Sequence, residues 1–214
     1  MADPVYRSDV FTVKNLAGAK RIILTPEPDS STDESWEKET PWVAATLERV
    51  LTVAPEHSVL DFGCGIGRLS KALMRGTGCA VLGVDISSTM RAQAHLYVDS
   101  ENFTATSPGG LARLAGAGFR ADHAFAVWVL QHCYDPEAEI VRVRDALKPG
   151  GLFCVINSKQ RWVPTDKGWQ QDDKNVRELL RDNFDEVATH PLAVGPMSEM
   201  LVKTSFFQVY RKPA

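Results

Sequence analysis

From Ser58 onward, the chain alternates short apolar segments with helical patterns, and this alternation constrains its fold more than any other feature. Five segments have the length and apolar content of buried strands, at residues 58–62, 80–84, 102–106, 124–130 and 152–156. Between them, apolar residues recur every three or four positions, as on one face of a helix. Strands separated by helices form parallel sheets with helices on both faces. We therefore expect a doubly wound α/β fold.

Two further segments, at 185–191 and 205–210, can pair as an antiparallel hairpin at the C-terminal end of the sheet. The sheet would then have seven strands, most of them parallel. A chain of 214 residues suits one such domain. Because Thr40 and Pro41 resemble a helix N-cap and a first helical residue, we expect the domain to occupy residues 41–214.

Residues 1–40 are expected to form an irregular leader. Pro26, Pro28 and the polar cluster at 29–33 are typical of a loop. Trp36 and Trp42 follow, with acidic residues between them. This pattern fits either a lid over a site or a segment that packs the leader against the sheet.

Composition limits the partners and the location of the protein. The net charge is −3 and there is no long run of Lys or Arg, so we expect no nucleic-acid partner. The longest apolar runs are too short to cross a bilayer, and residues 1–4 lack the basic, apolar start of a secretory signal. We therefore expect no membrane contact and a cytoplasmic location. The four cysteines are scattered and lack metal-ligand spacing, so free thiols and no metal site are expected.

The first strand runs into a glycine-rich loop, which spans residues 61–68 with the sequence DFGCGIGR. Glycines at alternate positions let the backbone turn sharply and approach a ligand, and the next helix offers free N–H groups at the same edge. The loop therefore predicts a nucleotide or nucleoside site, although a tight strand–helix turn also explains it. Dinucleotide-binding loops have glycine at the sixth position counted from Gly63. Arg68 stands there, which disfavours an NAD-dependent oxidoreductase.

Asp85 ends the second strand. A carboxylate at this edge can accept hydrogen bonds from the two hydroxyls of a ribose. It can also stabilise the N-terminus of the following helix. The glycine loop on the preceding strand favours the ribose-binding interpretation.

Together these motifs resemble the class I methyltransferases, which use S-adenosylmethionine. Four segments carry the resemblance, in the family's order and spacing: VLDFGCGIGRLS (59–70), VLGVDIS (81–87), ADHAFAVWVLQH (121–132) and ALKPGGLFCVIN (146–157). The resemblance covers about residues 58–157. It implies S-adenosylmethionine as the cofactor and S-adenosylhomocysteine as the product.

The resemblance also implies roles for individual residues. Asp61 and the loop residues would hold the methionine part of the cofactor, and Asp85 would hold the ribose. The loop residues concerned are Gly63, Cys64, Gly65 and Gly67. Ile86 and Met90 would line the adenine pocket, although plain core packing explains both equally well.

One departure from the family pattern concerns the adenine. Many members place an acidic residue just after the third strand, whereas this chain has Thr106 and Ser107. A hydroxyl of either residue, or a backbone carbonyl, would have to accept the bond from the adenine amino group.

The methyl group should be presented near the end of the fourth strand, between Trp128 and His132. His132 is the candidate general base because its ordinary pKa lies near neutrality. Gln131 is a candidate for orienting the acceptor. Both residues can instead satisfy backbone groups at the strand end. Much of the catalysis would come from alignment and exclusion of water.

The acceptor is expected to be a small molecule, methylated on oxygen, nitrogen or carbon. The chain lacks the D/N-P-P-Y/F sequence that enzymes acting on base nitrogens or glutamine amides carry after the fourth strand. Residues 161–164 and 196–200 are candidate walls of the acceptor site, with Arg161 and Trp162 as possible contacts. A protein methyltransferase and a non-catalytic cofactor-binding module remain alternatives. The sequence does not predict the oligomeric state.

Overall fold

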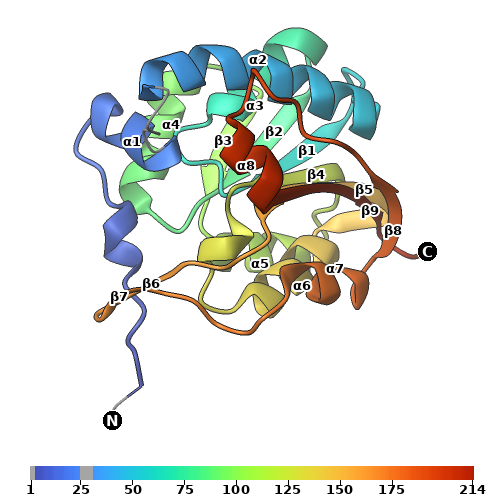
Figure 1. The fold of residues 1–214 in the computed structure, drawn as a ribbon. Helices are drawn as coiled ribbons and strands as arrows, with labels where there is room; N and C mark the ends of the chain where they lie inside the picture. Colours follow the sequence, from blue (N-terminus) through green and yellow to red (C-terminus); the bar gives the residue numbers. More distant parts are fainter. Residues whose placement is uncertain (1–2, 25–30) are drawn as a thin grey trace.

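The computed structural model describes residues 3–24 and 31–214 (Figure 1). Its main sheet has seven strands in the order β3-β2-β1-β4-β5-β9-β8. Strands β1 to β5 pair in parallel, and β9 runs antiparallel to both β5 and β8. The strands are β1 Ser58–Phe62, β2 Ala80–Val84, β3 Phe103–Thr106, β4 Ala121–Val127, β5 Leu147–Ser158, β8 Asp185–Thr189 and β9 Ser205–Arg211. The predicted doubly wound α/β fold with a C-terminal antiparallel hairpin is confirmed.

Helices cover both faces of the sheet because successive strand residues point to opposite sides (Figure 1). Val59 packs into one apolar cluster with α2, α3 and α4, and Leu60 packs into another with α5, α6 and α7. The first three helices are α2 Thr32–Leu51, α3 Arg68–Thr77 and α4 Ser88–Val98. The other three are α5 Pro108–Gly116, α6 Pro136–Asp145 and α7 Val176–Arg181.

Short elements surround the carboxyl ends of the parallel strands. They are η1 Ser8–Phe11, α1 Leu16–Ile23, η2 Leu130–His132, β6 Val163–Thr165, β7 Gly168–Gln170 and α8 Glu199–Thr204. The β6–β7 pair forms a separate antiparallel hairpin. Within the described part of the chain, no helix combines the length and the apolar character that a membrane crossing needs.

The predicted start of the first long helix at Pro41, with Thr40 as its N-cap, is wrong. Helix α2 begins nine residues earlier, at Thr32, where Ser31 and Glu34 form a reciprocal capping box. Pro41 lies inside this helix, where it removes one backbone donor without ending it. The expected division of the chain at residue 40 therefore falls within α2.

The leader is also more ordered than predicted. Helix α1 is capped by Asn15, whose side chain accepts a bond from the Gly18 amide. Pro26 and Pro28 of the predicted loop lie outside the described residues, while residues 31–33 belong to the α2 cap and first turn.

Two core boundaries differ from the prediction as well. Strand β4 spans 121–127, three residues earlier than expected, because Trp128 adopts a left-handed backbone with φ of 61°. Strand β5 starts at Leu147, five residues before the predicted strand at 152–156, and includes the Lys-Pro-Gly-Gly segment, with a register shift against β4 there.

Candidate functional site

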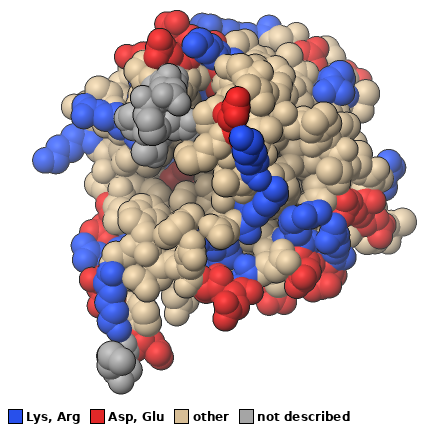
Figure 2. All heavy atoms as spheres, in the orientation of Figure 1, with Lys and Arg blue, Asp and Glu red and all other residues tan. Residues whose placement is uncertain are grey.

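A cavity of about 1470 Å³ opens where the carboxyl ends of β1, β2 and β4 meet. The strand order reverses here, since β1 pairs with β2 on one side and β4 on the other. Such a switch point is where doubly wound sheets bind ligands. Figure 2 shows this face of the molecule, with uncharged side chains around much of the hollow.

The glycine loop after β1 needs its glycines. Gly63, Gly65 and Gly67 have φ of 81°, 54° and 78°, a region that side chains with a Cβ rarely adopt. A Cβ on Gly63 would lie 2.1 Å from a methyl group of Val129, and one on Gly65 would lie 2.8 Å from Ile23. The loop is therefore packed against two other segments. Of its glycines, Gly63 and Gly65 line the cavity.

Cys64 and Asp61 are buried and do not line the cavity. The Cys64 amide donates to the carbonyl of Val84 at 2.9 Å, which fixes the loop to β2. Asp61 accepts a hydrogen bond of 2.5 Å from the Ser70 hydroxyl in α3. Burial raises the pKa of Asp61 to about 7, against the smaller opposing effect of this bond. The predicted contacts of Asp61, Cys64 and Gly67 with the methionine part of the cofactor stay predictions.

Asp85 lies at the end of β2 and lines the cavity. One carboxylate oxygen accepts from the Gly65 amide and the other from the Ser87 amide, each at 2.8 Å. Burial raises the pKa of Asp85, while these two bonds lower it. Each oxygen retains a lone pair. The carboxylate can thus accept further bonds from a diol, and it also fixes the glycine loop.

The expected adenine side is only partly formed by the predicted residues. Ile86 and Met90 both line the cavity, Ile86 with 47% of its surface exposed and Met90 buried in a cluster with α1. Thr106 and Ser107 are not among the lining residues. The Ser107 hydroxyl accepts from the Gly110 amide at the start of α5, at 3.0 Å. Their contact with adenine stays a prediction.

His132 has a defined tautomer. Its Nδ1 lies 2.7 Å from the carbonyl oxygen of Trp162, which can only accept, so Nδ1 carries the proton. Nε2 is then the acceptor, and it lies 3.3 Å from the side-chain amide nitrogen of Gln131. Burial lowers the pKa of His132. The ring lines the cavity as a neutral imidazole with its lone pair on Nε2.

Gln131 joins the ends of β4 and β5. Its side-chain oxygen accepts from the Ser158 backbone amide at 2.9 Å, and its backbone N–H donates to the Asn157 side-chain oxygen at 3.2 Å. The side chain therefore orients His132 and secures the strand ends, which is the structural alternative for this residue.

An aromatic wall, defined as Phe11, His132 and Trp169, encloses this part of the cavity. The ring centres of Phe11 and Trp169 lie 6.1 Å and 5.3 Å from that of His132. The leader brings Phe11 there because it pairs with the β6–β7 hairpin, with the Arg7 amide bonded to the Pro164 carbonyl at 3.0 Å. This pairing could not be predicted from the sequence, since short edge contacts leave no periodic pattern.

The predicted wall at 161–164 divides into two roles. Trp162 lines the cavity, but Arg161 does not. The Arg161 guanidinium is buried and bonded to Asp172 and to the carbonyls of Leu130 and Cys133. All of these partners are groups of the protein itself. The predicted contact of Arg161 with an acceptor is therefore wrong.

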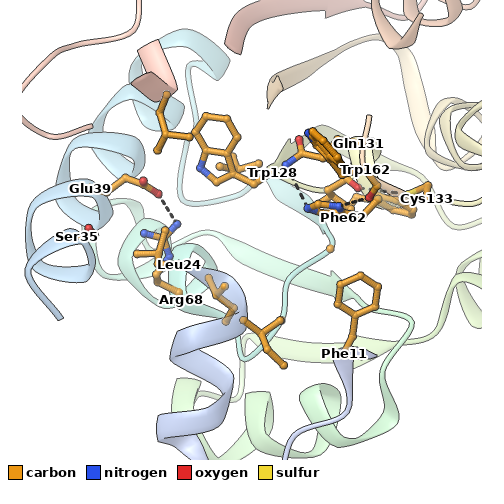
Figure 3. A pocket seen from close by; sticks show the side chains of 18 of the residues that line it. Phe11, Leu24, Ser35, Glu39, Phe62, Arg68, Trp128, Gln131, Cys133 and Trp162 are labelled. Carbon is orange, nitrogen blue, oxygen red and sulfur yellow. Dashed lines mark hydrogen bonds and ion pairs between the residues drawn. The ribbon is translucent and has the colours of Figure 1, made fainter. Parts of the chain in front are cut away.

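A buried ion pair was missed by the sequence reasoning. Glu39 of α2 and Arg68 of α3 lie 2.8 Å apart with side chains 2% and 3% exposed, and both line the cavity (Figure 3). Thr40 accepts a bond from the same guanidinium at 3.1 Å, and the Trp36 ring lies 5.4 Å from it. The available signal was Glu39 itself, a carboxylate on the otherwise apolar helix face formed by Trp36 and Val43.

The fold and this cavity define an α/β protein with a glycine-loop cofactor site. Residues 60–155 match the family model described as a methyltransferase domain. The chain is 27% identical over 139 residues to a sterol 24-C-methyltransferase of Gibberella zeae, covering 64% of this chain and 35% of that protein. It is 34% identical over 124 residues to a ubiquinone biosynthesis O-methyltransferase of Cereibacter sphaeroides, covering 53% and 47%. The chain therefore spans less than half the length of these relatives.

Solved structures share the fold. Magnesium protoporphyrin IX methyltransferase from Synechocystis PCC 6803, with bound SAH, superposes with a TM-score of 0.62 at 19% identity, covering 90% of this chain and 92% of that one. Over residues 60–155 the chain is therefore similar to the class I S-adenosylmethionine-dependent methyltransferases, the family that the sequence motifs resemble. S-adenosylmethionine is the cofactor that this similarity implies.

Proposed function

We propose that this protein transfers a methyl group from S-adenosylmethionine to an oxygen, nitrogen or carbon atom of a small-molecule acceptor. The observation that carries the proposal is the position of Asp85 and the glycine loop on one cavity, at the point where the strand order reverses. This is the arrangement that binds a ribose and its attached groups in doubly wound sheets.

The residues fit the cofactor in size and in chemistry. The cavity volume of about 1470 Å³ exceeds the few hundred to a thousand Å³ usual for one ligand, which leaves room for an acceptor beside the cofactor. Asp85 would hold the ribose hydroxyls, and Gly63 and Gly65 would let the chain approach the ligand closely. When bound, the cofactor supplies an electrophilic methyl group on a sulfonium.

His132 is the proposed proton acceptor. Its ring lines the cavity, its Nε2 accepts from the Gln131 side-chain amide, and the Trp162 carbonyl keeps the proton on Nδ1. An acceptor hydroxyl or amine would displace the 3.3 Å contact with Gln131 and give its proton to Nε2. Phe11 and Trp169 would exclude water from this position and align the acceptor.

The acceptor proposed here is a compact molecule with an apolar or aromatic body. The aromatic wall supports this, because flat rings and apolar groups pack well on Phe11 and Trp169. Figure 2 adds support, since basic and acidic side chains are mixed on the face that it shows, with no single-sign patch around the hollow. Absence of nucleic-acid partners and a cytoplasmic location stay predictions from the sequence.

The test is transfer of labelled methyl from S-adenosylmethionine to a panel of phenols, carboxylic acids, amines and activated carbon acids, with a polypeptide mixture as a separate arm. The Asp85→Ala chain is the control. Label in a small acceptor, lost in the control, supports the proposal. Label in polypeptides alone would favour a protein methyltransferase. Cofactor binding with no transfer to any acceptor would favour a non-catalytic module, and binding of NAD in place of S-adenosylmethionine would favour an oxidoreductase.

A further inference from the structure

Two hydrogen-bond donors in the cavity wall have no partner in the part of the chain that the structure describes. Among the described residues, the buried side-chain nitrogen and oxygen atoms without a hydrogen bond are Arg68 Nε, Trp128 Nε1 and Ser205 Oγ. Arg68 and Trp128 both line the cavity, and Ser205 does not. A buried N–H group without a partner has lost its hydrogen bonds to water and gained none in return, which destabilises the folded protein. Two such donors on one cavity therefore point to a ligand with a strong acceptor group.

The Arg68 guanidinium is held so that Nε remains free. Its two terminal nitrogens donate to Glu39 at 2.8 Å and to Thr40 at 3.1 Å. The Trp36 ring, 5.4 Å away, packs on the same group. With side chains 2–3% exposed, the guanidinium and the Glu39 carboxylate have little freedom to turn. Glu39 is thus a positioning residue for Arg68.

Trp128 reaches the same cavity from the end of β4, whereas Arg68 follows β1 and begins α3. Trp128 follows β4 with φ of 61°, and its ring packs against the apolar cluster that also contains Val43 of α2 and Leu69 of α3. Figure 3 shows the indole nitrogen on the side of the ring that faces Glu39 and Arg68. Both orphan donors therefore lie toward the start of α3.

The cofactor offers one acceptor group that suits this place. Asp85 is assigned to the ribose, so the start of α3, beyond the glycine loop, is left for the methionine end. That end is a zwitterion, whose only hydrogen-bond acceptors are its carboxylate oxygens. The Arg68–Glu39 pair is neutral in sum, and a zwitterion adds no net charge beside it. We propose that Arg68 Nε and Trp128 Nε1 donate hydrogen bonds to the α-carboxylate of the methionine part of S-adenosylmethionine. This inference rests on the proposed function.

The test is calorimetry with two ligands that differ only in this group: S-adenosylhomocysteine and its decarboxylated analogue, S-adenosyl-3-thiopropylamine. Trp128→Phe keeps the ring and removes the N–H, and Arg68→Lys keeps the charge and removes Nε. Trp42→Phe is the matched control, because Trp42 packs on the same cluster and does not line the cavity.

We expect Trp128→Phe and Arg68→Lys each to weaken S-adenosylhomocysteine binding roughly tenfold or more, the range for a hydrogen bond to a charged group. The affinity of both variants for the decarboxylated analogue should stay within about twofold of that of the unaltered chain. Trp42→Phe should change the affinity for neither ligand. Equal weakening of both ligands, or of neither, would overturn the assignment. An unaltered chain that binds neither ligand would overturn the proposed function and this inference together.

Discussion

Replacing Glu39 by Gln should destabilise the fold far more than a surface change of the same kind. The carboxylate lies 2.8 Å from Arg68, and both side chains are almost completely buried. Breaking a buried pair leaves an uncompensated charge and costs about 3–5 kcal/mol. Because the Gln amide oxygen can still accept one bond, we expect about 3 kcal/mol. For a domain of this size, that lowers Tm by roughly 6–12 °C.

The assay is urea unfolding followed by circular dichroism, with Glu199→Gln as the matched control. Glu199 pairs with Lys203 at 3.0 Å, but both side chains are more than 70% exposed. Loss of that pair should cost about 0.5 kcal/mol or less. A second change, Arg68→Met in the Glu39→Gln chain, should recover part of the loss because it removes the unpaired charge. If Glu39→Gln lowers the free energy of unfolding by no more than Glu199→Gln does, the buried pair does not stabilise the fold as described.

Three further predictions concern the loop and the strand ends. Gly63→Ala should lower the free energy of unfolding in urea by roughly 2–4 kcal/mol, because alanine would need a φ of 81° and its Cβ would lie 2.1 Å from Val129. An unchanged unfolding midpoint would contradict this. Burial raises the pKa of Asp61 from 3.8 to about 7. Between these pH values the folded chain keeps a proton on Asp61 that the unfolded chain releases. The contribution of Asp61 to the free energy of unfolding therefore falls as the pH rises from about 4 to 7. Asp61→Asn should remove that slope when unfolding is compared at pH 5 and 8, and a parallel dependence in both chains would refute the sign. If His132 accepts the proton, kcat/KM should fall as the pH falls through its lowered pKa, and His132→Gln should lose that limb of the profile; the same profile in both chains would exclude the role.

The core of the fold followed from local chemistry. A few consecutive residues determine each of its main features, so these could be predicted from the sequence. They are the buried strands around Leu60 and Leu82, the glycine loop and Asp85. Their meeting at one edge follows from the rules for parallel sheets.

What the sequence did not predict depends on contacts between distant segments. Thr40 and Pro41 have the chemistry of a helix start, but the capping box at Ser31 and the packing of α2 on the sheet override it. In the sequence Arg68 indicates only a departure from a dinucleotide loop, because its partner Glu39 lies 29 residues away. Arg161 has the chemistry of a ligand contact, and only the fold brings Asp172 to its side.

Calorimetric titration of S-adenosylhomocysteine into the unaltered chain and into Asp85→Ala measures whether the cavity binds this ligand and whether Asp85 contributes to the binding. Asp85 is the lining residue whose carboxylate is expected to receive the ribose hydroxyls. We predict binding to the unaltered chain and a loss of roughly tenfold or more on the substitution, with Glu199→Gln unchanged. Absence of binding to the unaltered chain, or equal affinity of the Asp85→Ala chain, would contradict the account.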